Sequence, residues 1–294
     1  MGHDHEGQRV SRRRLIAGIS SLGLGGLLAA CSDSGTATVT TSTGASVTPE
    51  ATTAKDLTSL FADANTCTLT ATTTQGPYYF DAEKIRSDIR EDKQGVRLRV
   101  AIKVQDSETC EPLSNAVVEI WHCDAAGLYS GAEAQSTGGG GGTPPTGAPP
   151  GGPPTGGPPG GGPGGRPGDG GRGDMGDLTP TDDERYLRGA QVTNADGIVE
   201  FTTIWPGWYR GRTIHIHAMV HFSNERVLTT QVMFDEAVNK AVLAKSPYSE
   251  RAGRDTFNDD DNIYQDNMLM KVTEEDDGYL GVIVFSADSD KDGS

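Results

Sequence analysis

Short runs of β-branched and aromatic residues, separated by turn signals, recur along most of this chain of 294 residues. Runs of this length fit strands, and turn signals such as Asp196-Gly197 separate them. Helical periodicity is sparse and is confined to 236–244. The predicted strands are 96–104, 116–121, 197–204, 213–222, 228–234 and 279–285. This spacing predicts an all-β fold, an antiparallel β-sandwich with few short helices.

Low-complexity stretches set the predicted domain boundaries. Residues 31–64 are mostly Thr, Ser, Ala and Gly, which predicts a flexible tether. The Gly/Pro-rich segment 137–177 cannot bury apolar surface and predicts a disordered insert, either a spacer or a lid or partner-binding loop. We therefore expect one domain over 65–294, interrupted by this insert, with about two hundred residues available for a core.

The amino terminus is predicted to be a targeting signal and not a part of the folded domain. Ser11-Arg12-Arg13-Arg14-Leu15-Ile16 resembles a twin-arginine export signal, and the apolar stretch 16–30 is too short and glycine-rich for a membrane span. Leu28-Ala29-Ala30-Cys31 resembles a bacterial lipobox, in which a lipidated Cys31 becomes the first mature residue. We expect a signal over 1–30 and a protein of the bacterial cell envelope, lipid-anchored on the outer side of the cytoplasmic membrane or secreted.

The chain is acidic. Its formal net charge is −16, and removal of residues 1–30 takes away two acidic and four basic residues, which makes it −18. Such a surface opposes binding to nucleic acids and to anionic membranes, so no nucleic-acid partner is expected and the membrane is reached through Cys31. The acidic run Asp259-Asp260-Asp261 is interpreted as solvated loop charge.

Cys67, Cys110 and Cys123 follow Cys31 in a chain that we expect in an oxidising compartment. Cys110 precedes one end of the strand predicted over 116–121 and Cys123 follows its other end, which separates the two by about 20 Å at strand rise. Cys67 is therefore the expected partner of one of them. Cys110 is favoured, because Cys123 is expected to be buried, and Cys123 stays open as the alternative.

Two histidines one residue apart indicate half a metal site. Successive side chains of a strand point to opposite faces, so His215 and His217 project together while Ile214 and Ile216 face a core. Residues 31–294 contain only two further histidines, of which His122 is predicted to be structural. Imidazoles suit zinc, copper, iron or nickel. The nearest oxygen donor is Tyr209, whose phenolate favours a trivalent ion and therefore iron(III).

At this point the chain resembles the intradiol ring-cleavage dioxygenases, the family of the protocatechuate 3,4- and catechol 1,2-dioxygenases. The resemblance extends over about residues 65–285 and rests on four segments. These are Gln75-Gly76-Pro77-Tyr78-Tyr79, the segment from Ile120-Trp121 to Tyr129-Ser130, the segment from Leu187-Arg188-Gly189 to Phe201, and the run from Tyr209 through Arg212 to His215-Ile216-His217.

The resemblance implies a role for each matching residue. It implies a non-haem Fe(III) held by Tyr129, Tyr209, His215 and His217, with Tyr209 acting also as a base. Arg212 matches the arginine that faces the bound catecholate, and Gln231 lies near the family's active-site glutamine. Gly76 and Pro77 match residues of the substrate pocket.

The resemblance further implies cleavage of a catechol-type ring between its two hydroxyl-bearing carbons, with O2, to a muconic-type diacid. One alternative is a non-catalytic extracytoplasmic β-sandwich that binds a partner, because fold alone does not determine function. A binding module has no need of Tyr129, Tyr209, His215 and His217 together. Another alternative, a zinc hydrolase built on the histidine pair, lacks a nearby carboxylate base. The oligomeric state stays open.

Overall fold

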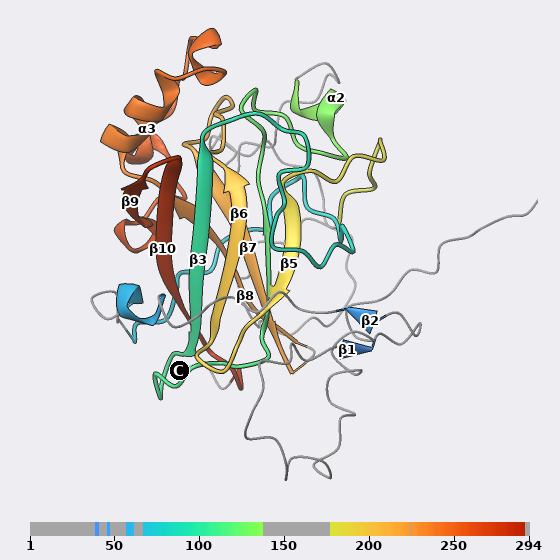
Figure 1. The fold of residues 1–294 in the computed structure, drawn as a ribbon, viewed down its shortest axis with the longest axis vertical. Helices are drawn as coiled ribbons and strands as arrows, with labels where there is room; N and C mark the ends of the chain where they lie inside the picture. Colours follow the sequence, from blue (N-terminus) through green and yellow to red (C-terminus); the bar gives the residue numbers. More distant parts are fainter. Residues whose placement is uncertain are drawn as a thin grey trace, which may run out of the picture.

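The computed structural model describes residues 39–40, 46–47, 57–61, 67–137, 177–223 and 225–291 (Figure 1). The predicted export signal, Cys31, most of the predicted tether and nearly all of the Gly/Pro-rich insert lie outside these residues. Within the described ranges, no helix has the length and apolar character needed to cross a membrane.

Two four-stranded sheets form the fold (Figure 1). The first has the order β6-β3-β10-β9 and the second β5-β4-β7-β8. The first sheet comprises β6 (Ile198–Ile204), β3 (Arg97–Asp106), β10 (Gly278–Ala287) and β9 (Lys271–Glu275). The second comprises β5 (Arg188–Val192), β4 (Val117–Trp121), β7 (His215–Phe222) and β8 (Glu225–Met233). The predicted β-sandwich is confirmed. Its strand pairs are antiparallel except β3 and β10, which run parallel.

The remaining elements are short. They are β1 (Val39–Thr40), β2 (Ser46–Val47), η1 (Thr58–Phe61), α2 (Glu133–Ser136), α3 (Glu236–Leu243), η2 (Tyr248–Glu250), η3 (Asn258–Asp260) and η4 (Asp266–Met268). The helix predicted over 236–244 is present as α3, and its start is fixed by Asp235, whose carboxylate accepts the amides of Ala237 and Val238. The pair β1 and β2 lies within the predicted tether.

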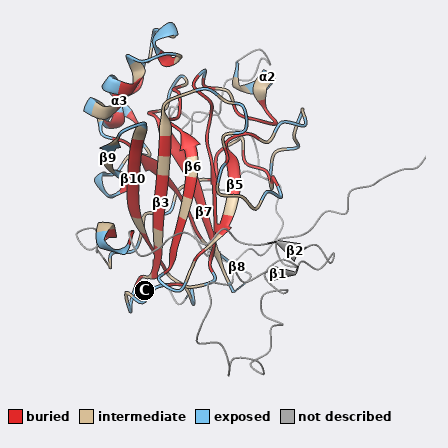
Figure 2. Ribbon diagram, in the orientation of Figure 1, coloured by how far each residue is buried: buried red, intermediate tan, exposed pale blue. Residues whose placement is uncertain are grey.

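The core lies between the sheets, whose strands are largely buried (Figure 2), and it is built by strand alternation. Leu98, Val100 and Ile102 of β3 point inward, as do Ile216 and Ala218 of β7, and all five are buried. Burial of these alternating apolar side chains supplies the main stabilisation, at about 25 cal/mol per Å² of apolar surface. The opposite face of β7 is left for His215 and His217.

The outer face of the second sheet carries polar and aromatic residues in one row. Arg188 pairs with Trp121, Trp121 with His217 and His217 with Gln231, so these four side chains emerge side by side from β5, β4, β7 and β8. Residues 67–90, named here the covering segment, pack over this row. Their contacts include Tyr79 with Trp121, at 4.7 Å between ring centroids.

A disulfide fixes the start of the covering segment. Cys67 bonds to Cys110, with 5.5 Å between the Cα atoms, and Cys123 is a free, buried thiol. The favoured pairing is thus confirmed. Hydrogen bonds then attach the segment to both sheets, from the Thr70 amide to the Ser286 carbonyl (2.9 Å) and from the Thr73 amide to the Thr229 carbonyl (2.8 Å).

Candidate active site

Three donor atoms meet at the amino-terminal end of β7. The Nε2 atoms of His215 and His217 are 3.1 Å apart, and the Tyr209 hydroxyl lies 3.1 Å from His215 Nε2. Both histidines are buried, and Tyr209 is half-buried in the loop that precedes the strand. The predicted alternation therefore places both imidazoles on one face of β7. The loop before this strand places the Tyr209 hydroxyl beside them.

The tautomer of His215 follows from its second ring nitrogen. His215 Nδ1 lies 2.6 Å from the Thr213 carbonyl oxygen. Because a carbonyl oxygen only accepts, Nδ1 carries the proton and Nε2 presents its lone pair toward Tyr209 and His217. A backbone partner of this kind orients an imidazole for ligation through its other nitrogen.

Tyr129 adds a second phenol from the turn that follows β4. Its ring centroid is 5.8 Å from that of Tyr209 and 6.2 Å from that of His217. The side chain is fully buried, and its hydroxyl has no hydrogen-bond partner in the described part of the chain. Leaving a buried hydroxyl unsatisfied costs about 1–3 kcal/mol, so a ligand bound within the cluster would gain from contact with this oxygen.

The turn before Tyr129 is tightly specified. Asp124 Oδ1 accepts the amides of Ala126 and Leu128, both at 2.9 Å. Gly127 has a φ of +82°, and a Cβ there would lie 2.4 Å from the Trp208 carbonyl oxygen. The turn therefore packs directly against the loop that carries Tyr209, which brings the two tyrosines together.

Burial disfavours the charged form of every side chain in this cluster. It raises the pKa of Tyr129 and Tyr209 above the ordinary tyrosine value, and it lowers the pKa of His215 and His217 below the ordinary histidine value. A bound cation reverses this preference for the phenols, because it stabilises the phenolate directly.

The donor set fits a metal ion with imidazole and phenolate ligands. Metal bonds to nitrogen and oxygen ligands are about 2.0–2.2 Å long, so one ion could contact donor atoms that lie 3.1 Å apart. Among the described residues, no group of three or more His, Cys, Asp and Glu side chains could hold a metal ion. A site at this position therefore depends on the two tyrosines together with the two histidines.

The covering segment closes over the cluster at Gly76. Its φ is +74°, and a Cβ there would lie 2.9 Å from His217 Cε1, so only glycine fits without displacement. On β4, Trp121 stacks with the His217 ring at 5.0 Å and 7°. The predicted pocket residue Pro77 follows Gly76 and is half-buried.

Two residues without a predicted role also contact this site. Tyr78 stacks on Tyr129 with 4.7 Å between ring centroids and meets Tyr209 edge-on at 6.5 Å. Arg188 is buried, and its Nη2 donates to the carbonyl oxygens of Tyr78 (2.8 Å) and Ser130 (2.9 Å). In the sequence, these two contacts were indicated only by the aromatic pair Tyr78-Tyr79 that follows Gly-Pro and by the position of Arg188 next to a glycine.

Arg212 and Gln231 lie together at the edge of the cluster. Arg212 Nη2 donates to Gln231 Oε1, and Gln231 pairs across the sheet with His217. Arg212 Nε donates to Asp261 Oδ2 at 2.9 Å. The interpretation of 259–261 as solvated charge is wrong for Asp261, whose side chain is 0% exposed, because this carboxylate turns inward to Arg212.

His122 lies apart from the cluster, in the interior. Its Nδ1 lies 2.7 Å from the Cys123 carbonyl oxygen and its Nε2 lies 2.7 Å from Thr203 Oγ1. Both ring nitrogens thus have protein partners, as expected for a structural histidine.

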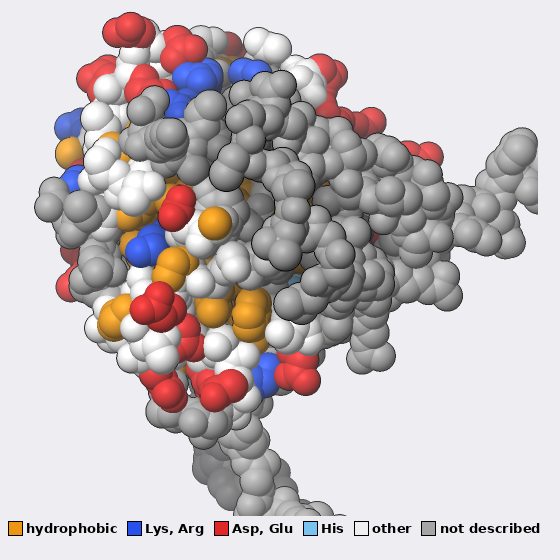
Figure 3. Space-filling model, turned by 60° about the horizontal axis from the view of Figure 1, so that its bottom comes forward, with side chains coloured by type: hydrophobic (Ala, Val, Ile, Leu, Met, Phe, Trp, Pro, Cys, Tyr) orange, Lys and Arg blue, Asp and Glu red, His pale blue; other side chains and the backbone are white. Residues whose placement is uncertain are grey.

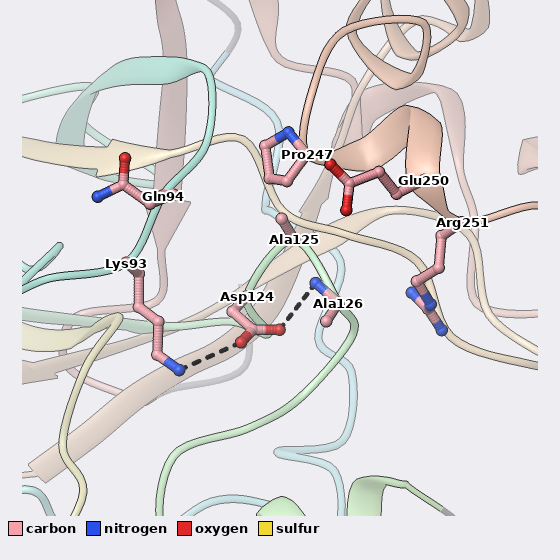
Figure 4. Close-up of a pocket in the computed structure, with 8 residues that line it drawn as sticks. All are labelled: Lys93, Gln94, Asp124, Ala125, Ala126, Pro247, Glu250 and Arg251. Carbon is pink, nitrogen blue, oxygen red and sulfur yellow. Dashed lines mark hydrogen bonds and ion pairs between the residues drawn. The ribbon is translucent and has the colours of Figure 1, made fainter.

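A separate polar pocket of about 440 Å³ lies beside the turn before Tyr129 (Figure 4). None of the predicted site residues lines it; the lining is Lys93, Gln94, Asp124, Ala125, Ala126, Pro247, Glu250 and Arg251. Elsewhere on the surface, acidic side chains are spread over the described part of the face in Figure 3.

Comparisons with known proteins place the fold. No protein-family model and no curated protein matches the chain. The intradiol ring-cleavage dioxygenase from Tetranychus urticae superposes with a TM-score of 0.60 and 28% identity, covering 76% of this chain and 96% of that one. A second dioxygenase crystal structure superposes with a TM-score of 0.59 and 30% identity over the same shares of the two chains. On these similarities and the fold, the chain belongs to the intradiol ring-cleavage dioxygenase family.

Proposed function

We propose that this protein is a non-haem iron(III) dioxygenase that opens a catechol-type ring between its two hydroxyl-bearing carbons with O2, giving a muconic-type diacid. The observation that carries the proposal is the meeting of Tyr209 Oη, His215 Nε2 and His217 Nε2 at spacings of 3.1 Å. The buried Tyr129 ring lies 5.8 Å from the Tyr209 ring and 6.2 Å from the His217 ring, which supports its hydroxyl as the fourth donor.

The four residues Tyr129, Tyr209, His215 and His217 would hold the iron. Phenolates favour a trivalent ion, and the imidazoles suit iron. When bound, iron(III) would supply Lewis acidity toward the catechol oxygens and draw electron density from the ring, which makes the ring reactive toward dioxygen.

Tyr209 is suited to move a proton. It is half-buried, whereas Tyr129 is fully buried, so Tyr209 is the tyrosine of the cluster that lies nearer to solvent. As a phenolate, Tyr209 accepts a proton from a catechol hydroxyl at its Oη atom. General-base help of this kind contributes about 10²- to 10⁴-fold in rate.

Arg212 is suited to stabilise negative charge on the substrate. Its side chain is 19% exposed and is held beside Gln231, next to His217 on the neighbouring strand. A fixed guanidinium facing a water-poor site favours the anionic ring that develops during the reaction.

The substrate approaches from the side on which the half-buried residues lie. Pro77, Tyr78, Tyr209 and Arg212 are half-buried, whereas His215, His217 and Tyr129 are buried behind them. The half-buried Tyr78 ring, which stacks on Tyr129, adds aromatic surface beside the cluster, and this suits a flat aromatic substrate.

The alternatives account for less of the geometry. A partner-binding sandwich does not need buried phenol and imidazole donors at hydrogen-bonding distance. A zinc hydrolase needs a free carboxylate base, and Asp261 is occupied by Arg212 and by the Thr213 amide at 2.8 Å.

The proposed location is the bacterial cell envelope. The twin-arginine-like run 11–16 and the lipobox ending at Cys31 support export and lipid anchoring. The Cys67–Cys110 disulfide agrees with an oxidising compartment.

Oxygen uptake by the iron-loaded protein against a panel of catechols tests the activity. We expect stoichiometric iron, a visible tyrosinate-to-iron charge-transfer band and oxygen consumption with at least one catechol. His217→Ala should lose iron, colour and activity together. The matched control is His221→Ala, on the same strand, which should keep all three. Colourless wild-type protein that binds zinc in place of iron would contradict the proposal.

A further inference from the structure

Asp261 is a buried carboxylate with a specific set of partners. Its Oδ2 accepts Arg212 Nε at 2.9 Å and the Thr213 amide at 2.8 Å, and its Oδ1 accepts the Ile263 amide at 2.9 Å. Burial opposes its ionisation, but the Arg212 charge and the backbone amides hold its pKa below the usual value. Asp261 is thus an ionised group held by the backbone, and Arg212 is fixed by it.

Two acceptors clamp the Arg212 guanidinium in one plane. Asp261 receives Nε and Gln231 receives Nη2, while Nη1 makes no hydrogen bond within the described part of the chain. A planar fork held at two nitrogens has little freedom to rotate. The clamp therefore leaves one nitrogen of the guanidinium for a ligand.

The clamped charge acts on the donor cluster. Arg212 directly precedes Thr213, whose carbonyl oxygen accepts His215 Nδ1 at 2.6 Å, and Gln231, which accepts Arg212 Nη2, pairs across the sheet with His217. Arg212 is therefore close enough to exert its field on the atoms around which the substrate would bind.

We propose that Asp261 is a positioning residue for this reaction: its carboxylate holds the Arg212 guanidinium at the edge of the donor cluster, where that charge meets the anionic substrate without reorganisation. The inference rests on the proposed function. Preorganised charge is effective in catalysis because the orientation cost is met during folding. Gln231 alone would hold the guanidinium at a single nitrogen.

A double-mutant cycle tests the proposal. Asp261→Asn keeps an acceptor oxygen but removes the charge, and it should lower kcat about tenfold, as expected for weakening one charge-assisted hydrogen bond. Iron content and the visible band should not change. In an Arg212→Ala background the same substitution should change kcat less than twofold, because its effect passes through Arg212. Asp255→Asn is the control, since Asp255 accepts the neighbouring Gly211 amide but no Arg212 nitrogen.

A second measurement is independent of turnover. In metal-free protein, the Arg212 Nε–H signal in a two-dimensional NMR spectrum should be protected from exchange, and Asp261→Asn should remove that protection. Equal kcat losses in both backgrounds, loss of iron in Asp261→Asn, or an unchanged Nε–H signal would overturn the proposal. If wild-type protein cleaves no catechol, the proposed function fails, and the NMR result alone decides whether Asp261 positions Arg212.

Discussion

Removal of the Cys67–Cys110 disulfide should destabilise the protein by about 4 kcal/mol. The two cysteines are 43 residues apart in sequence, and closing a loop of that size restricts the unfolded chain. Chain-entropy arithmetic for this separation gives about 4 kcal/mol at 25 °C. The loss arises in the unfolded state, so the folded sandwich should be retained.

Urea unfolding of a Cys67→Ala/Cys110→Ala double variant measures this loss. With a slope of about 2 kcal/mol per M, the midpoint should fall by about 2 M. Cys123→Ala is the control, because it removes a buried thiol that closes no loop.

Iron binding should survive the loss of the disulfide. The hydrogen bonds of Thr70 and Thr73 still attach the covering segment to β10 and β8. A free-energy loss under about 1 kcal/mol, or reaction of both cysteines with a thiol reagent in denatured, unreduced protein, would refute this reasoning.

Three further predictions concern the site and its surroundings. Gly76→Ala should lower the free energy of unfolding by about 1–2 kcal/mol because residue 76 has a positive φ, and it should weaken iron retention because the new Cβ would lie 2.9 Å from His217 Cε1. Urea unfolding measures the first effect and dialysis against a chelator measures the second. Unchanged stability and unchanged iron content would contradict this prediction. Burial lowers the pKa of His122 from 6.5 to about 4, so the neutral imidazole contributes about 3 kcal/mol to the free energy of unfolding above pH 6.5, and this contribution is lost as the pH falls to 4. The free energy of unfolding of His122→Gln should therefore change less between pH 6.5 and pH 4 than that of wild type. An equal change in both proteins would contradict the buried, neutral state of His122. Tyr209→Phe should keep iron with a changed colour and slow turnover by about two orders of magnitude, whereas Tyr264→Phe should match wild type in a steady-state assay. Parent-level turnover by Tyr209→Phe would exclude a base role for this residue.

Strand alternation predicts most of the sandwich. The predicted runs correspond to β3, β4, β6, β7, β8 and β10, each of which carries an apolar inward face. The strand pattern does not predict β5 or β9. Strand β5 contains a buried arginine and a glycine, and β9 (Lys271–Glu275) has no buried residue, so neither shows apolar alternation. The parallel pairing of β3 with β10 joins residues far apart in sequence, which local pattern cannot reveal.

The candidate site likewise contains some residues that local sequence pattern predicts and others that only tertiary contacts bring into place. Residues in the motif, such as His215 and His217, are predicted because strand geometry fixes their direction locally. The direction of Asp261 depends on a tertiary contact with Arg212, so the charge run gives no sign of it. Tyr78 and Arg188 likewise acquire their contacts only when the covering segment packs on the second sheet.

Product analysis under isotopically labelled dioxygen tests the central claim most directly. Iron-loaded protein is incubated with a catechol that supports oxygen uptake, and the product is identified by mass spectrometry. We predict a muconic-type diacid that carries both labelled oxygen atoms, lost in His217→Ala and retained in His221→Ala. An unlabelled product, a ring opened outside the two hydroxyl-bearing carbons, or no product from coloured, iron-replete protein would contradict the claim.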